Sequence, residues 1–328
     1  MADRRPTPVA RRVAFRYKAY GLAIVADAEM PELPPVRDLR EASLTRVRVT
    51  LRGATRVPAE PAQWLSVTAY PDGKPWLKSA KVADGYLLRF PGLADFMVGA
   101  DGCSVDCVAA GGDVAEVTLR HLVIDHVMPR VLNLLGIEAL HATAVVAAAG
   151  ACAFIGEAGT GKSTLAASFH LAGLPALCDD CLVLRDEGRI LATPAYPGMR
   201  LWDDSFAAIA GGAEAGPPVA HYTTKTRLVG DVANFAATPQ PLVRIYFLRR
   251  VAAGAPPAVE RITPAEAFPE LIGASFPLDL GDAAMLARHF LMISHVAASV
   301  ALRRLLIPTD FGALAAVRAA VIADLEAG

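Results

Sequence analysis

Eight consecutive residues have the types and the spacing of a phosphate-binding loop. Positions 156–163 are GEAGTGKS, which matches the pattern G-x-x-x-x-G-K-[ST] at every fixed position. The glycines let successive backbone N–H groups turn toward phosphate oxygens, and a following helix adds the positive end of its dipole. Lys162 would reach the outer phosphates and the Ser163 hydroxyl would ligate Mg²⁺. We predict that ATP and Mg²⁺ are bound by Gly156, Glu157, Ala158, Gly159, Thr160, Gly161, Lys162, Ser163 and Thr164.

The segments on either side of this loop fit the same interpretation. The apolar run at 151–155 is typical of a buried strand, and residues 164–169 are typical of a helix. The alternative is a glycine-rich turn between a strand and a helix that binds nothing. Because the pattern, the strand and the helix agree, the sequence favours the phosphate site.

Two adjacent carboxylates follow one helix and one turn after the loop. Asp179 and Asp180 lie between apolar neighbours in residues 177–182, where unpaired charges would be costly to bury. Adjacent strand residues point to opposite faces, but at a strand end or bulge both can reach one site. One carboxylate can then hold Mg²⁺ while the other accepts a proton from an attacking hydroxyl. The sequence does not decide which aspartate holds the metal ion and which accepts the proton. The alternative to a functional pair is an exposed turn between two short strands.

Four further side chains are candidates for assisting roles. His141, at the head of a predicted strand, can hydrogen-bond to the Asp pair and tune its pKa; a purely structural histidine is the alternative. Arg200, Lys225 and Arg227 can neutralise phosphate charge. Solvated basic residues on the surface are the alternative for these three.

The five cysteines suggest a second kind of site. Cys103 and Cys107 form one pair, and Cys178 and Cys181 form a C-x-x-C pair, so that together they could hold zinc. The second pair brackets the two aspartates in an otherwise apolar run. This favours reduced, metal-free core cysteines in a reducing cytosol.

The elements that would position these residues follow a mixed α/β pattern. Residues 13 to about 100 favour strands, at 46–51 and 85–90 among others, and a helix bent near Pro129 follows. Residues 141–147 and 151–155 predict a hairpin, so the sheet is not purely parallel. We predict further strands at 176–178, 181–184, 190–192 and 244–248, and helices at 264–271, 283–297 and 311–325.

The fold class predicted from this pattern is α/β. A phosphate-loop kinase domain with a mixed sheet, residues 112–328, is expected behind a smaller β-rich domain, residues 1–111. The boundary is placed at the Gly111-Gly112 pair.

Composition restricts the classes of function. The chain has 328 residues, of which 54% are hydrophobic, so a sizeable core is expected. The net charge of −1 gives no overall field toward nucleic acid or a membrane surface. The apolar stretch 290–307 contains two arginines and predicts a buried or amphipathic helix. We expect a cytoplasmic protein without a signal peptide.

The order of these motifs resembles the catalytic domain of the bacterial HPr kinase/phosphorylase family. It consists of His141 on a strand, a hairpin, the GEAGTGKS loop, one helix, and the CDD sequence at 178–180 ahead of an apolar strand. The resemblance covers residues 138–185 well and the rest of the C-terminal half loosely. The YGL at 20–22 and the PELP at 31–34 resemble HPr-kinase-related proteins, some of which phosphorylate lasso-peptide precursors.

The resemblance implies a phosphotransferase in which the loop binds Mg-ATP. Asp179 would accept the proton, Asp180 would hold the metal ion, and His141 would assist them. Bifunctional members carry a glutamate directly after the loop, where this chain has Thr164, and their downstream glycine-rich signature is not found at 189–212. These departures favour a kinase without efficient reverse phosphorolysis, acting on an acceptor other than HPr.

We therefore expect ATP-dependent phosphorylation of a serine or threonine in a peptide or small protein, with a lasso-peptide precursor as one candidate. A kinase for a small-molecule hydroxyl is the first alternative, and nothing in the sequence separates it from a peptide kinase. The second is a nucleotide-gated binding protein with weak ATPase activity. The Asp pair argues against the second, because gating needs no proton acceptor. Assembly into a homo-oligomer stays open.

Overall fold

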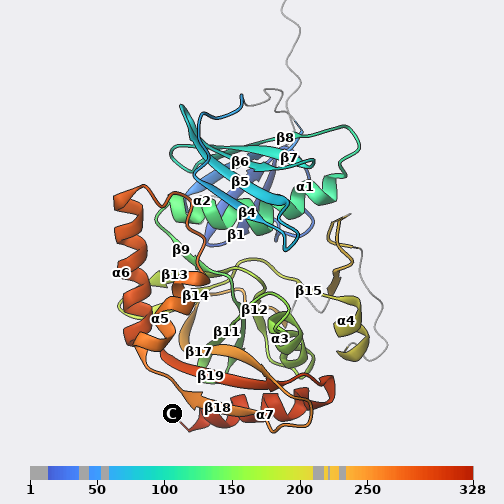
Figure 1. The fold of residues 1–328 in the computed structure, drawn as a ribbon, viewed down its shortest axis with the longest axis vertical. Coiled ribbons are helices and arrows are strands. Elements are labelled where there is room, and N and C mark those ends of the chain that lie inside the picture. Colours follow the sequence, from blue (N-terminus) through green and yellow to red (C-terminus); the bar gives the residue numbers. More distant parts are fainter. Residues whose placement is uncertain are drawn as a thin grey trace, which may run out of the picture.

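The computed structural model describes residues 14–36, 44–52, 59–209, 218–220, 222–228 and 234–327. In this part of the chain, two mixed β-sheets are stacked with a helical layer between them, as Figure 1 shows from top to bottom. The fold class is therefore α/β, as the sequence predicted. No helix in the described residues is long and apolar enough to cross a membrane.

The first sheet, here called the N-terminal sheet, has eight strands in the described residues and the order β1-β2-β3-β8-β7-β6-β5-β4. β3 pairs in parallel with β2 and β8, and the other neighbours are antiparallel. β4 forms one edge, next to β5. The strands are β1 (Phe15–Ala19), β2 (Leu22–Ala26), β3 (Arg46–Thr50), β4 (Ser66–Ala69), β5 (Pro75–Val82), β6 (Gly85–Phe90), β7 (Ala94–Gly99) and β8 (Ser104–Ala109).

The helical layer consists of α1 (Glu116–Leu122), a π-helical turn (Val123–Val127) and α2 (Met128–Leu134). The bend predicted near Pro129 stays a prediction, but the helix changes there: a π-helical turn lies just before this proline. Proline has no N–H to donate to the preceding turn, so the regular hydrogen-bond pattern must change there. Apolar side chains on both sides of these helices are buried against the two sheets.

The second sheet, here called the central sheet, contains nine strands in the described residues. One path through it runs β12-β10-β11-β17-β14-β13-β9, and β19 pairs with β17 and with β18. Its strands are β9 (Glu138–Leu140), β10 (Thr143–Ala147), β11 (Gly150–Ile155), β12 (Ala176–Cys178), β13 (Leu182–Asp186), β14 (Ile190–Thr193), β17 (Gln240–Val251), β18 (Ala258–Arg261) and β19 (Ala301–Pro308). β15 (Met199–Leu201) and β16 (Thr226–Leu228) form a separate pair.

The hairpin predicted just before the GEAGTGKS loop is confirmed. β10 and β11 are antiparallel neighbours joined by a turn at residues 148–149. On its other side β11 pairs in parallel with β17. Gly150 starts β11 with a φ of 134°, and a Cβ there would lie 2.6 Å from the carbonyl oxygen of Pro241. Glycine at this position therefore allows β11 to approach β17 closely.

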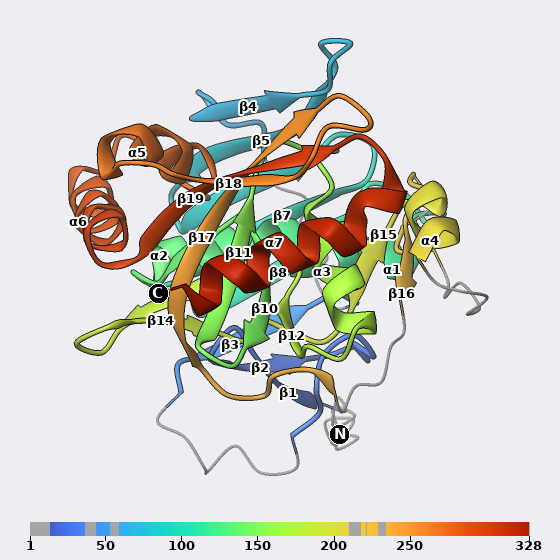
Figure 2. The ribbon, with the colours of Figure 1, turned by 90° about the horizontal axis from the view of Figure 1, so that it is seen from below.

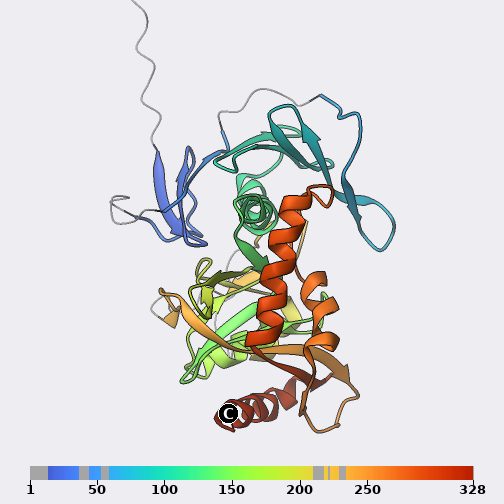
Figure 3. The ribbon, with the colours of Figure 1, turned by 90° about the vertical axis from the view of Figure 1, so that its left-hand side faces the viewer.

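Helices cover the free face and one side of the central sheet. α3 (Lys162–Leu171) and α7 (Leu314–Glu326) lie on the face turned away from the helical layer, and Figure 2 shows them crossing in front of the strands. The aromatic side chains of Phe154, Phe169 and Tyr246 pack in the core between them. α5 (Pro264–Gly273) and α6 (Ala283–Ser299) flank the sheet, and α6 runs from the helical layer to the central sheet (Figure 3). A short α4 (Asp203–Ile209) lies near α3.

Most elements predicted in the C-terminal half are confirmed within two or three residues, the clear exception being the stretch 290–307. This stretch is not one helix: α6 ends at Ser299 and β19 begins at Ala301. β19 pairs along its whole length with β17, so an inner position in the sheet explains its continuous apolar character. The division at residues 111–112 stays a prediction, since α1 and α2, which follow it, belong to the layer between both sheets.

Candidate functional site

The predicted phosphate-binding loop connects β11 to α3. Residues 156–161 form it, because β11 ends at Ile155 and α3 begins at Lys162. Gly159 and Gly161 have φ values of 80° and 98°, which glycine adopts without strain. A Cβ on Gly156 would come within 2.8 Å of the Thr160 hydroxyl oxygen. The backbone path of the loop therefore requires its glycines.

Lys162 is folded back across the loop. Its Nζ donates hydrogen bonds to the carbonyl oxygens of Gly156 at 2.8 Å and Glu157 at 3.2 Å. Burial lowers the pKa of Lys162, and the carboxylates of Asp180 and Asp179 oppose this shift. An ammonium group held only by neutral carbonyls can form stronger, charge-assisted hydrogen bonds with phosphate oxygens.

Asp179 lies beneath the loop with 2% of its surface exposed. Its Oδ1 accepts hydrogen bonds from Ser163 Oγ at 2.8 Å and Thr143 Oγ1 at 3.0 Å, and its Oδ2 accepts one from the Arg200 backbone N–H at 2.9 Å. Burial raises the pKa of Asp179, and the neighbouring charge of Asp180 adds to the rise. Three donors compensate part of the desolvation of this carboxylate. The alternative of an exposed turn is therefore wrong for Asp179.

Asp180 occupies the turn after β12 with a left-handed φ of 60°. Its Oδ2 lies 3.5 Å from Arg200 Nη2, and its Oδ1 lies 3.9 Å from His141 Nδ1. Burial alone would raise the pKa of Asp180, but the charges of Arg200, His141 and Lys225 outweigh burial and hold this pKa at about 2. The turn lies at a strand end, one of the two places where the sequence allowed adjacent carboxylates to lie close together, and both approach Arg200 there.

His141 lies beside Asp180, between β9 and β10. Its Nδ1 is 3.3 Å from the backbone carbonyl oxygen of Asp180, and its ring meets the ring of Phe276 at 6.0 Å in an edge-on arrangement. Burial lowers the pKa of His141, and the charge of Asp180 opposes the shift. The lowered pKa favours a neutral imidazole at pH 7.

Arg200 is the cation at the centre of a buried acidic cluster. Its side chain is 3% exposed and forms an ion pair with Asp125. It also lies 3.7 Å from an oxygen of Asp179 and 3.5 Å from an oxygen of Asp180. Asp125 in turn meets His121 Nδ1 at 2.5 Å. Three carboxylates thus surround one guanidinium, which allows the Asp pair to be buried.

Replacing Arg200 by methionine is expected to destabilise the protein by about 3–5 kcal/mol, because buried carboxylates would lose their cation. Urea unfolding followed by circular dichroism measures the change. Arg227→Met is the matched control: Arg227 is the partner of Arg200 in the β15–β16 pair, and it contacts Glu32 only at 3.9 Å. The control should cost at most about 1 kcal/mol. Equal effects of the two substitutions would contradict the central role of Arg200.

A cavity of about 640 Å³, here called the acceptor cavity, opens beside the loop and Asp180. Lys162, Ser163 and Thr164 line it from α3. Tyr70 and Trp76, from β5 and the turn before it, line it from the N-terminal sheet. The cavity is therefore built from both sheets, and its volume is typical of ligand-binding sites.

A further wall of the acceptor cavity comes from the helical layer, which sequence reasoning did not connect with the site. It consists of His121, Asp125, His126 and Arg130, which lie in or beside the π-helical turn Val123–Val127. Such turns occur frequently at functional sites. Burial lowers the pKa of His126 to about 3, and the charge of His121 contributes to the shift. The four-residue spacing of His121 and Asp125 is the one sequence signal that could have indicated this pair.

The structure brings two of the three predicted phosphate-binding cations to the acceptor cavity. Arg200 and Lys225 line it, and Lys225 Nζ lies 5.1 Å from the centre of the Trp202 ring. Arg227 is not among the described residues that line the cavity, and its guanidinium is directed to Glu32 instead.

The C-x-x-C cysteines lie on either side of the Asp pair. Cys178 and Cys181 are buried in the apolar core, and burial raises the pKa of both thiols. At neutral pH both are therefore protonated side chains of the core. Their freedom from metal stays a prediction.

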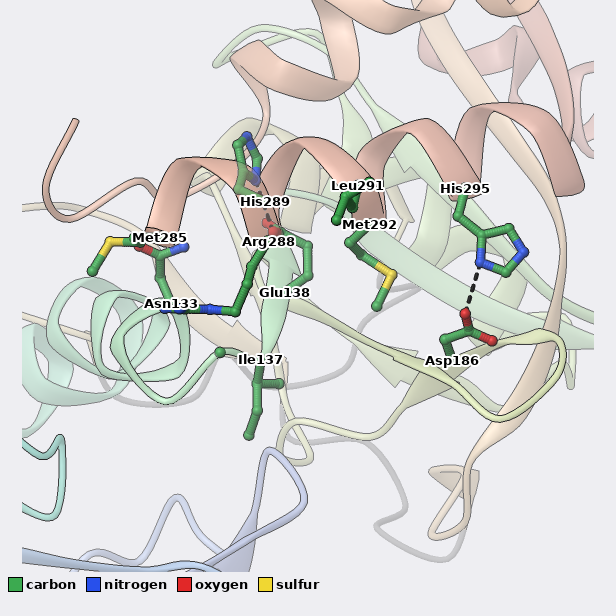
Figure 4. Close-up of a pocket in the computed structure, with 11 residues that line it drawn as sticks. Asn133, Ile137, Glu138, Asp186, Met285, Arg288, His289, Leu291, Met292 and His295 are labelled. Carbon is green, nitrogen blue, oxygen red and sulfur yellow. Dashed lines mark hydrogen bonds and ion pairs between the residues drawn. The ribbon is translucent and has the colours of Figure 1, made fainter. Parts of the chain in front are cut away.

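Two other cavities lie outside this site. One, of about 800 Å³, lies on the other side of the loop between β17 and α5. The other, of about 390 Å³, lies beneath α6 and is shown in Figure 4. There His289 and His295 each meet a carboxylate at 2.7 Å, Glu138 and Asp186 respectively. Each histidine is thus already paired with a carboxylate, and no residue of the loop lines this cavity.

Comparisons with known proteins add little to the geometry. A scan against protein-family models finds no match, and a search of curated proteins finds none either. Among solved structures, the Hpr(Ser) kinase/phosphatase from Coxiella burnetii matches over 57% of this chain and 97% of that chain, with 12% identity and a TM-score of 0.30. A TM-score of this size is too low to support an argument about function. Such an argument must therefore rest on the residues of the site.

Proposed function

We propose that the protein is a kinase that transfers the γ-phosphate of Mg-ATP to a hydroxyl group bound in the acceptor cavity. The observation that carries the proposal is the hydrogen bond from Ser163, in the phosphate-binding loop, to Asp179, with Asp180 at the cavity surface beside it. Phosphoryl transfer needs positioned phosphates, a held metal ion and a nearby carboxylate rather than covalent catalysis. This arrangement supplies a residue for each of these tasks.

We assign the metal-related role to Asp179 and the proton-acceptor role to Asp180, the reverse of what the family resemblance implied. Ser163 donates its hydroxyl hydrogen to Asp179, which leaves the lone pairs of Ser163 free for Mg²⁺. Asp179 would thus orient the metal ligand from behind. Asp180 lines the cavity and Asp179 does not, so only Asp180 can approach an acceptor hydroxyl there. A proton acceptor must first lie within hydrogen-bonding distance of the hydroxyl, and its pKa matters only once this condition is met.

Mg²⁺, when bound, would neutralise charge on the phosphate oxygens. The Ser163 hydroxyl, oriented by Asp179, offers a hard oxygen ligand of the kind that this ion prefers, and substrate phosphates would supply further oxygen ligands. His141 accompanies Asp180 and would position its carboxylate.

The nucleoside part of ATP fits the cavity of about 800 Å³ on the other side of the loop. This cavity and the acceptor cavity share His141, Ala158 and Arg250, so they meet beside the loop. ATP in one and the acceptor in the other would bring the γ-phosphate to this junction. A near-attack arrangement of this kind supplies much of the rate in phosphoryl transfer.

A peptide or small protein is the proposed acceptor. β4 is the edge strand of the N-terminal sheet in the described residues, all four of its side chains are exposed, and Thr68 of this strand lines the acceptor cavity. An extended peptide can pair with such an edge and continue into the cavity. A small-molecule hydroxyl is the second candidate, because the cavity volume alone also suits a metabolite.

The test is transfer of label from γ-labelled ATP in the presence of Mg²⁺, with serine peptides encoded near the gene and a panel of small hydroxyl compounds offered in parallel. Label in a peptide supports the proposal in full. Label only in a small compound would keep the kinase and change the acceptor class. Hydrolysis of ATP without any labelled acceptor, even at high acceptor concentration, would support the nucleotide-gated alternative instead.

A further inference from the structure

Arg130 is a basic residue of the acceptor cavity that the proposed transfer chemistry does not use. It lies in α2 and lines the cavity from the helical layer, which lies above α3 in Figure 1. One of its N–H groups donates to the carbonyl oxygen of His126 at 2.7 Å. Its guanidinium carbon lies 6.0 Å from the centre of the Phe276 ring, within the range of a cation–π contact.

The charge of Arg130 is not neutralised within the described part of the chain. No carboxylate of the described residues forms an ion pair with it, and burial is the only influence on its pKa, which falls to about 10. Arg200, in the same cavity, is surrounded by three carboxylates. A half-buried guanidinium that has a carbonyl and an aromatic ring beside it but no carboxylate keeps part of its desolvation cost, and an incoming anion would offset that cost.

The position of Arg130 favours an anion of the acceptor over one of the nucleotide. Arg130 lines the acceptor cavity but not the cavity of about 800 Å³ on the other side of the loop. The Phe276 ring lies next to both Arg130 and His141, at 6.0 Å from each. The path from Arg130 to His141 by way of the Phe276 ring is the sum of these two distances. An extended peptide advances about 3.3–3.6 Å per residue, so about three residues cover this path.

We infer that Arg130 binds a carboxylate of the acceptor, located within about three residues of the hydroxyl that is phosphorylated. The inference rests on the proposed function, since it adds a specificity-determining residue to the same cavity. A guanidinium presents two parallel N–H groups to a carboxylate, so recognition would be directional as well as electrostatic. The carboxylate can come from an aspartate or glutamate side chain or from the C-terminus of a peptide.

The probes are serine peptides in matched pairs. In the first pair an aspartate within three positions of the serine is exchanged for asparagine, and in the second a C-terminal carboxylate is exchanged for the amide. Binding to the full-length protein loaded with Mg²⁺ and a non-hydrolysable ATP analogue is measured by NMR, and label transfer is measured with ATP. The binding measurement does not require turnover, so it is separate from the test of kinase activity.

The wild type should favour the charged member of one pair by about ten- to a hundredfold, as for a hydrogen bond to a charged group. Arg130→Gln should bring that ratio close to one, and Arg130→Lys should keep part of it. The pair that responds identifies the source of the carboxylate. Arg288→Gln, at an exposed residue of the cavity beneath α6, is the matched control and should keep the wild-type ratio.

Several results would overturn the inference and leave the proposed function intact. The first is the absence of any preference, or of any binding, for the charged peptides in a wild type that still binds Mg-ATP. The second is a preference that survives Arg130→Gln in a protein with unchanged thermal stability. The third is a loss of Mg-ATP affinity in Arg130→Gln, which would place Arg130 in the nucleotide site.

Discussion

Lys162→Ala is expected to weaken Mg-ATP binding by about ten- to a hundredfold while the protein stays folded. Its Nζ is bound only by the loop carbonyls of Gly156 and Glu157 in the described structure. Phosphate oxygens would replace these neutral acceptors by charged ones, and hydrogen bonds to charged groups contribute about 1.5–3 kcal/mol. Alanine at this position keeps the helix, since it has the highest helix propensity.

Titration calorimetry with Mg-ATP measures the loss, and thermal unfolding checks the fold. Lys74→Ala is the matched control, because Lys74 is an exposed lysine whose Nζ contacts Asp72 at 3.1 Å in the turn after β4. It should leave the affinity for Mg-ATP unchanged. If the Lys162 variant binds Mg-ATP as tightly as the control does, the loop is not the nucleotide site. That result would also contradict the proposal that the protein is a kinase.

The parts of the site that could be predicted are those encoded in short stretches of sequence. The loop, the hairpin before it and the helix after it follow from glycine spacing and apolar periodicity over about thirty residues. Asp179 and Asp180 could be connected with the loop because one helix and one strand separate them from it. The same local reasoning pointed to His141, which lies two residues before the hairpin.

The remainder depends on contacts between residues distant in sequence. Asp125 and Arg200 form the ion pair that allows the Asp pair to be buried, and no periodicity links positions so far apart. The π-helical turn that carries Asp125 has no reliable sequence signal, so the wall containing Arg130 was not predicted. The apolar pattern of β19 was interpreted as a helix because an inner strand and a buried helix look alike over a short run.

The second large effect is expected at Asp180. Asp180→Asn should retain Mg-ATP binding and lose about two to four orders of magnitude in phosphate transfer, the usual loss when a proton acceptor is removed. Asparagine is the suitable replacement for two reasons. It keeps the size of the side chain, and it tolerates the left-handed φ of 60° found at Asp180. Arg200 keeps its contacts with Asp125 and Asp179 in this variant, so the fold should persist.

Asp179→Asn distinguishes the two possible assignments of the Asp pair. If Asp179 orients Ser163, its amide variant should need a higher Mg²⁺ concentration and should recover transfer when Mg²⁺ is raised, since the Ser163 hydroxyl would still be present. Asp180→Asn should not recover, because no metal concentration replaces a missing proton acceptor. Rates of label transfer across a Mg²⁺ titration separate these behaviours. The opposite result, with Asp180→Asn rescued by Mg²⁺ and Asp179→Asn inactive throughout, would restore the roles that the family resemblance implied. That outcome would also require the buried Asp179 carboxylate to become accessible when substrates bind, because in the present arrangement three hydrogen bonds hold it beneath the loop.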